Sequence, residues 1–165
     1  MHCPRLPALV CLLFFALMRE GAAAPAVRTG EVMVREGNGG VPCFSISERE
    51  EARAGAPNFD SITVSEAGPG ARTPMWSMSM PRQRTFPVSF RMCVPYAGRL
   101  PVLPQTPAAA LQPGRVYEVA IEPRGPLAAK TPRSYRGRFC VAPAGSGMPA
   151  VRSAVADARG RYTCL

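Results

Sequence analysis

Apolar and polar residues alternate along many short segments of this chain. An alternation with a period of two is typical of β-strands that bury one of their faces. At residues 31–36, Val32 and Val34 alternate with other residues between the charged Glu31 and Arg35, and residues 41–47 continue the pattern after the glycine-rich sequence at 37–40. Because that sequence contains an Asn-Gly pair, which favours tight turns, the two segments predict a β-hairpin.

Alternating segments continue from here to the C-terminus. They lie at residues 61–65, 74–80, 87–94, 115–122, 134–142, 151–155 and 161–164. The clearest is 87–94, where every second residue from Val88 to Val94 is apolar. A charged stretch at 48–56 predicts one helical turn, which Pro57 would end. With about seven to nine short strands and almost no helix, the pattern predicts an all-β fold, an antiparallel β-sandwich or a small barrel.

The N-terminal residues have the pattern of an export signal. A short basic start leads into an apolar run at residues 8–18, and small residues follow at 21–24. We expect cleavage after Ala23, so that residues 1–23 are the signal peptide and residues 24–165 form a single β-rich domain. The apolar run and all later segments are shorter than a membrane-spanning helix requires, so we expect no membrane span. The predicted location is the periplasm or the outside of the cell.

The expected cleavage leaves four cysteines, namely Cys43, Cys93, Cys140 and Cys164. An even number of cysteines in an exported chain predicts two disulfides, and three connectivities are open. No two of these cysteines are close enough in sequence to form a zinc half-site. On their predicted strands, the first three lie on the face opposite the large apolar side chains. We therefore expect disulfides between neighbouring strands or to the C-terminal tail, and not a buried bond between two packed sheets.

The composition after cleavage limits the catalytic chemistry. The only histidine, His2, lies within the expected signal peptide, which excludes Ser-His-Asp triads, Cys-His pairs and histidine metal sites from the remaining domain. Glu118 and Glu122 share an outward strand face but lie too far apart to act on one bond, and the sole lysine, Lys130, has no motif around it. We therefore expect no enzymatic activity, no cofactor and no metal site. A carboxylate site without a recognisable motif is the enzymatic alternative.

The formal net charge is +9, and nearly all of the positive charge comes from arginine. Strong basicity is typical of proteins that bind nucleic acids, anionic surfaces or acidic proteins. The arginines are scattered, and no basic motif interleaved with aromatic residues occurs, so we expect no nucleic-acid partner. Three arginines at outward strand positions would attract an acidic protein patch if their strands are neighbours, namely Arg91, Arg136 and Arg138. The alternative is that they form an ordinary solvated surface.

A proline-rich connection at residues 95–113 is the best candidate for a contact surface. Loops of this length are uncommon in compact domains unless they bind something. The connection begins with Tyr96, Arg99 and Leu100, which are residue types that anchor protein interfaces. Its P-x-x-P spacings suit either polyproline recognition or a stiff connection along the surface. We expect its deletion to abolish partner binding and to leave the fold intact.

Six short motifs lie on or beside the predicted strands. They are VPCFSI at 41–46, ITVS at 62–65, MWSM at 75–78, MCVPY at 92–96, PGRVY at 113–117 and RFCV at 138–141. Together they resemble a group of small exported bacterial proteins described as type VI secretion immunity proteins of the periplasm. That resemblance implies a non-enzymatic protein that neutralises a toxin by covering its active site, and it assigns no catalytic residues. Members of the group are typically lipoproteins with a cysteine at the cleavage site, where this chain has none.

Two hypotheses of function follow from these patterns. The first is an exported protein-binding module, of the immunity type, whose contact surface combines the 95–113 connection with Arg91, Arg136 and Arg138. The second is a structural or envelope-associated protein that its basic charge holds on anionic surfaces. Salt distinguishes them, because surface adhesion is screened by modest salt whereas a packed protein interface persists.

Overall fold

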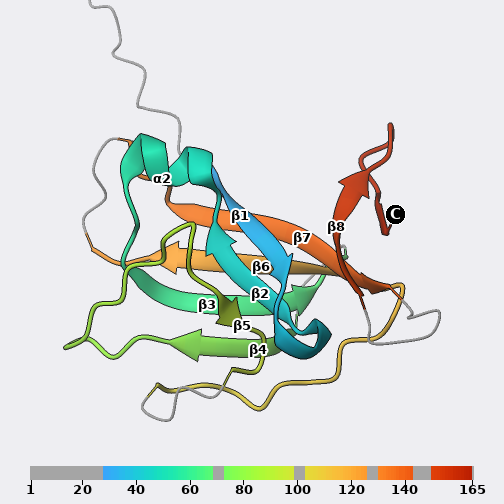
Figure 1. Ribbon diagram of the computed structural model, residues 1–165, viewed down its shortest axis with the longest axis horizontal. Helices are drawn as coiled ribbons and strands as arrows, with labels where there is room; N and C mark the ends of the chain where they lie inside the picture. Colours follow the sequence, from blue (N-terminus) through green and yellow to red (C-terminus); the bar gives the residue numbers. More distant parts are fainter. Residues whose placement is uncertain (1–27, 69–72, 99–102, 126–129, 143–149, 165) are drawn as a thin grey trace, which may run out of the picture.

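The computed structural model describes residues 28–164 apart from 69–72, 99–102, 126–129 and 143–149. Within these described residues, nine strands form one curled sheet whose inner face carries the core (Figure 1). The strands are β1 (Thr29–Glu36), β2 (Pro42–Ile46), β3 (Phe59–Glu66), β4 (Pro74–Ser79), β5 (Val94–Pro95), β6 (Val116–Pro123), β7 (Ser134–Ala142), β8 (Ala150–Ala156) and β9 (Tyr162–Cys164). The prediction of an all-β fold with seven to nine short strands is confirmed.

The sheet is mixed and not purely antiparallel. Its strand order is β4-β3-β6-β7-β1-β2-β5, and β8 pairs with both β7 and β9. All of these pairs are antiparallel except β1 and β7, which run parallel from Thr29↔Ser134 to Glu31↔Arg136. The expectation of an antiparallel sheet was wrong at this pair, because alternation identifies strands but carries no information about their direction. The result is an open half-barrel.

The predicted hairpin and helical turn are both confirmed. β1 and β2 pair antiparallel and are joined by a 3₁₀ turn, η1 (Asn38–Gly40). Gly39 and Gly40 adopt φ angles of 70° and 73°, which residues with a Cβ rarely take. The helical turn is α2 (Glu48–Ala54), and the hydroxyl of Ser47 caps it by accepting a hydrogen bond from an amide of its first turn.

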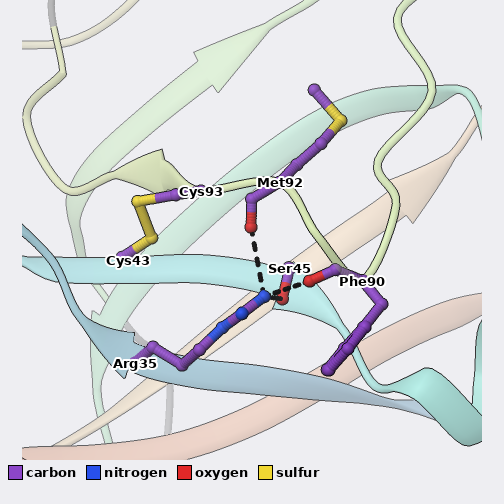
Figure 2. The surroundings of a disulfide bond; sticks show 6 residues. All are labelled: Arg35, Cys43, Ser45, Phe90, Met92 and Cys93. Carbon is purple, nitrogen blue, oxygen red and sulfur yellow. Dashed lines mark hydrogen bonds between the residues drawn. A yellow bond between two sulfur atoms is a disulfide. The ribbon is translucent and has the colours of Figure 1, made fainter.

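The strand expected at residues 87–94 is wrong for most of its length, since only the last residue joins β5. The preceding backbone is bound by side chains. The Glu51 carboxylate accepts a hydrogen bond from the Phe90 amide at 2.7 Å. The Arg35 guanidinium donates to the carbonyl oxygens of Phe90 and Met92 (Figure 2). These contacts satisfy backbone groups that a neighbouring strand would otherwise satisfy.

Aromatic side chains dominate the inner face of the sheet. Six of them are almost fully buried, namely Phe44, Phe59, Trp76, Tyr117, Tyr135 and Phe139. The ring of Tyr96, directly after β5, packs edge-on against Trp76 at 5.5 Å, and its hydroxyl donates to the Ala109 carbonyl oxygen at 2.6 Å. Tyr96 thereby links the β5 end of the sheet to the β4 end. Burial, with a smaller effect from Tyr117, raises the pKa of Tyr96 to about 12.

Residues 103–111 form a strap along the edge of β4 that β3 leaves open. Backbone hydrogen bonds of 2.9 Å run from Ser79 to Pro104, from Thr106 to Ser77 and from Ala109 to Met75. Leu103 and Leu111 pack against the core. The strap therefore covers a strand edge that could otherwise pair with another chain. This part of the predicted contact loop is integrated into the fold, which argues against the expectation that the loop can be deleted harmlessly.

Two disulfides hold the sheet. Cys43 in β2 is bonded to Cys93, just before β5, and Cys140 in β7 is bonded to Cys164 in β9 (Figure 2 shows the first pair). The expected pairing, between neighbouring strands or to the tail, is confirmed. Such bonds are typical of oxidising compartments outside the cytoplasm. Across the residues that the structure describes, no helix has the length and apolar character needed to cross a membrane.

Candidate functional site

Two strands share one edge of β7. β6 occupies the opposite edge, while β1 pairs with residues 134–136 and β8 pairs with residues 139–142. Gly137 and Arg138 lie between these two pairings, at the point where β1 and β8 diverge. We call this branch point of the sheet the fork.

Glycines allow the strands to approach closely at the fork. A Cβ on Gly137 would lie 2.7 Å from the carbonyl oxygen of Val32 and 3.0 Å from its Cβ. A Cβ on Gly30 would meet the ring of the buried Tyr135. The absence of both Cβ atoms therefore lets β1 lie against β7 before it bends away towards β2.

A buried carboxylate organises the outer face of the fork. Glu118 on β6 points away from the aromatic core, yet only 3% of it is exposed. One of its oxygens accepts from Arg136 Nη1 at 2.9 Å, and the other accepts from Arg138 Nε at 2.8 Å. Arg138 Nη2 lies 2.6 Å from the same second oxygen, and Arg136 Nη2 lies 3.6 Å from Glu122. The carboxylate thus fixes the direction of two guanidinium groups.

The hairpin formed by β8 and β9 leans over this face. The ring of Tyr162 on β9 stacks on the Arg138 guanidinium at 4.0 Å, a favourable cation–π arrangement. The Cys140–Cys164 disulfide ties the same hairpin to β7. Tyr162 and Val155 are nevertheless 39% and 46% exposed, so two of the three exposed large hydrophobic residues in the described chain lie on this hairpin.

One aspartate organises the turn between β8 and β9. Asp157 Oδ1 accepts hydrogen bonds from the amides of Arg159 and Arg161, each at 2.9 Å. Asp157 Oδ2 accepts from Arg161 Nε, also at 2.9 Å. These bonds, chiefly the one from the Arg161 amide, hold the pKa of the Asp157 carboxyl below its ordinary value.

Two hollows flank the stacked pair of Arg138 and Tyr162. The fork hollow, of about 460 Å³, is lined by Thr29–Val34 of β1, Glu118, residues 136–138, Ser153, Ala154 and Tyr162. The turn hollow, of about 330 Å³, is lined by Ala67, Gly68, Val116, Arg138 and residues 160–162. The stacked pair lines both, so moving it would reshape both hollows at once.

The structure brings only some of the predicted contact residues together. Arg136 and Arg138 lie side by side on the outer face of β7, as expected. Arg91 lies in the exposed turn before β5, and β1 and β2 separate β5 from β7 in the strand order. Tyr96 is buried with its hydroxyl bonded internally, so it is a core residue and not an available contact. The predicted contacts Arg99 and Leu100 lie outside the described residues.

Sequence reasoning missed Tyr162 and the role of Glu118. Tyr162 lies in a short segment near the C-terminus, where no pattern indicates that the hairpin folds back over β7. The alternation does place Glu118 on an outward face, but its burial depends on the register that sets it opposite Arg138. Within the described ranges, no group of three or more His, Cys, Asp or Glu side chains is placed to hold a metal ion.

The fold and the fork together define the class of this protein, a disulfide-bonded all-β domain built on one curled mixed sheet. Comparison with protein-family models, curated proteins and solved structures found no match to this chain.

Proposed function

We propose that this protein is an exported, non-enzymatic protein-binding module whose contact surface is the outer face of the fork. The observation that carries the proposal is the exposed Tyr162 ring, which stacks on the clamped Arg138 beside Arg136. We call these three residues the fork face.

The composition of the fork face supports a protein partner. Tyrosine and arginine are enriched among the residues that carry most of the binding energy at protein interfaces. Glu118 holds both guanidinium groups before a partner arrives, so less side-chain freedom is lost on binding. The hairpin is likewise fixed in advance by the Cys140–Cys164 disulfide.

The resemblance to periplasmic immunity proteins supports a more specific role. In this role, the module would cover the active site of a toxin delivered into the periplasm. The two disulfides support a compartment of this kind, because such bonds persist under oxidising conditions.

Capture of a partner by the oxidised protein tests the proposal. The bait is incubated with extracts of the producing strain and of close competitors and washed at high salt, and captured proteins are identified by mass spectrometry. The identified partner is then purified and its Kd is measured. We expect Tyr162→Ala and Arg136→Ala each to weaken binding at least about tenfold, as is typical of anchor residues.

Two further variants locate the surface. Arg53→Ala, on an exposed position of α2, is the matched control and should leave the Kd unchanged. Arg91→Ala tests the alternative surface before β5. A loss of binding in Arg91→Ala, with Tyr162→Ala unaffected, would move the contact surface away from the fork. The absence of any partner that survives high salt would contradict the module itself.

The second candidate function is attachment to an anionic envelope surface, which the net charge of +9 supports. It predicts binding to vesicles containing phosphatidylglycerol that modest salt abolishes and that Tyr162→Ala does not change. Such a result, together with an empty capture experiment, would favour this function.

A further inference from the structure

We infer that the turn hollow receives one acidic side chain, aspartate or glutamate, from the protein partner. The inference rests on the proposed function, since it specifies the chemistry of the partner at that surface.

The charges around the two hollows differ. Glu31 and Glu118 line the fork hollow and offset the charges of Arg136 and Arg138 there. Among the described residues that line the turn hollow none is acidic, and the charged side chains are Arg138 and Arg161. A carboxylate that enters the turn hollow therefore meets guanidinium groups and no acidic side chain of this lining, whereas one that enters the fork hollow meets Glu31 and Glu118.

Both arginines of the turn hollow are oriented by carboxylates outside it. Arg138 uses Nε and Nη2 on Glu118, and Arg161 uses Nε on Asp157. A guanidinium group has five N–H donors. Within the described residues, Arg138 Nη1 and both terminal nitrogens of Arg161 have no hydrogen-bond partner, so they can bind a further carboxylate. Hydrogen bonds between guanidinium and carboxylate groups are among the strongest in proteins, and pre-orientation lowers their entropic cost.

The shape of the turn hollow favours a side chain over a lipid surface. Tyr162 and Val116 provide apolar walls for the methylene groups of an acidic residue. The hollow lies between the hairpin and the start of β6. A single side chain can enter a hollow of about 330 Å³, whereas a bilayer presents its headgroups across a plane.

Titration with a blocked amino acid tests this inference without using the captured partner. The oxidised full-length protein, at low ionic strength, is titrated with N-acetylglutamic acid amide or with its neutral counterpart, N-acetylglutamine amide. The arginine Nε–H resonances of Arg138 and Arg161 are followed by NMR. We expect saturable shifts with the glutamate probe and at least about tenfold weaker binding of the glutamine probe.

Two arginines of the same turn provide a matched comparison. Arg161→Gln removes a charge that lines the hollow, and we expect it to weaken binding of the glutamate probe at least about fivefold. Arg159→Gln removes the same charge two residues away, at a position that does not line the hollow, and should leave the affinity within about twofold. If Arg161→Gln alters the amide spectrum of β9, Arg161→Lys replaces it and should retain the preference for glutamate over glutamine.

Three results would overturn the inference. They are equal effects of Arg159→Gln and Arg161→Gln, equal binding of the two probes, and preferential binding to phosphatidylglycerol vesicles with the same dependence on Arg161. Capture of a partner that requires Tyr162, together with no carboxylate binding, would refute this inference alone. Carboxylate binding without any captured partner would instead refute the proposed function.

Discussion

At the scale of single residues, the fork depends on the lack of a Cβ atom at Gly137. Gly137 follows directly after the residues of β7 that pair with β1, and the carbonyl of Val32 fills the space that a Cβ would need. The neighbouring arginines project to the other face, onto Glu118. At this position the inner face of β7 is tightly packed around Gly137, while its outer face carries the polar side chains of Arg136 and Arg138.

Gly137→Ala should destabilise the fold by about 1–3 kcal/mol, because the added methyl group overpacks the contact with Val32. Urea unfolding measures the change. Gly68→Ala is the matched control, since a Cβ there has no neighbour within 4 Å and its effect should stay within about 0.5 kcal/mol. Equal stabilities for the two variants would show that β1 does not pass over Gly137 as closely as described.

Residue types were easier to predict than residue environments. The alternation placed Arg136 and Arg138 correctly on an outward face. It could not indicate that Glu118, on the same face, would be buried, because its cover comes from side chains of β7 across the register. It also assigned Tyr96 to a contact surface, although Tyr96 closes the core between the two ends of the sheet.

At the scale of elements, the β8–β9 hairpin depends on the ionised side chain of its turn. Asp157 accepts hydrogen bonds from two amides and from the Arg161 side chain. The pKa of the Asp157 carboxyl is lower in the folded protein than its ordinary value. The ionised group therefore stabilises the turn above the unfolded pKa, and this stabilisation is lost as the pH falls through the lowered folded pKa.

We expect the amide resonances of Arg159 and Arg161 to shift together on acidification, with a midpoint below that of an ordinary aspartate. A pH titration by NMR measures this midpoint. In Asp157→Ala the common transition should disappear. A midpoint at the ordinary aspartate pKa would show that the turn does not depend on these hydrogen bonds.

Elements with a regular alternation were predictable, and elements held by side chains were not. The β1–β2 hairpin and β6 follow directly from the alternation of apolar and polar residues. The helix α2 follows from the charged stretch that Pro57 ends. The turn before β5 has the same alternation as a strand, but Arg35 and Glu51 bind its backbone. The strap shows no alternation, yet its backbone pairs with β4.

At the scale of the whole molecule, the two disulfides have separate roles. Cys43–Cys93 joins β2 to the residue directly before β5, which is the last strand in the order of the sheet. Cys140–Cys164 joins the outer hairpin to β7 and so maintains the Tyr162–Arg138 stack. Breaking the second bond should therefore affect the fork face more than the core.

Replacing Cys140 and Cys164 by alanine should cost about 3 kcal/mol of stability, given their sequence separation of 24 residues. Hydrogen exchange at β9 should accelerate while exchange at β3 and β6 stays slow. The matched variant replaces Cys43 and Cys93, which are 50 residues apart, and should cost about 4 kcal/mol and leave β9 protected. Unchanged protection of β9 in the first variant would show that the hairpin holds its position without the disulfide.

The parallel pairing of β1 with β7 determines when the domain can complete its folding. The β7 residues that pair with β1 follow it by more than a hundred residues, and contacts so distant in sequence form slowly. A chain that emerges N-terminus first can make the β1–β2 hairpin early. The other edge of β1 must wait until β7 has appeared, and the Cys140–Cys164 bond must wait for β9 as well. The topology therefore delays closure of the sheet until β7 has emerged, however early the β1–β2 hairpin forms.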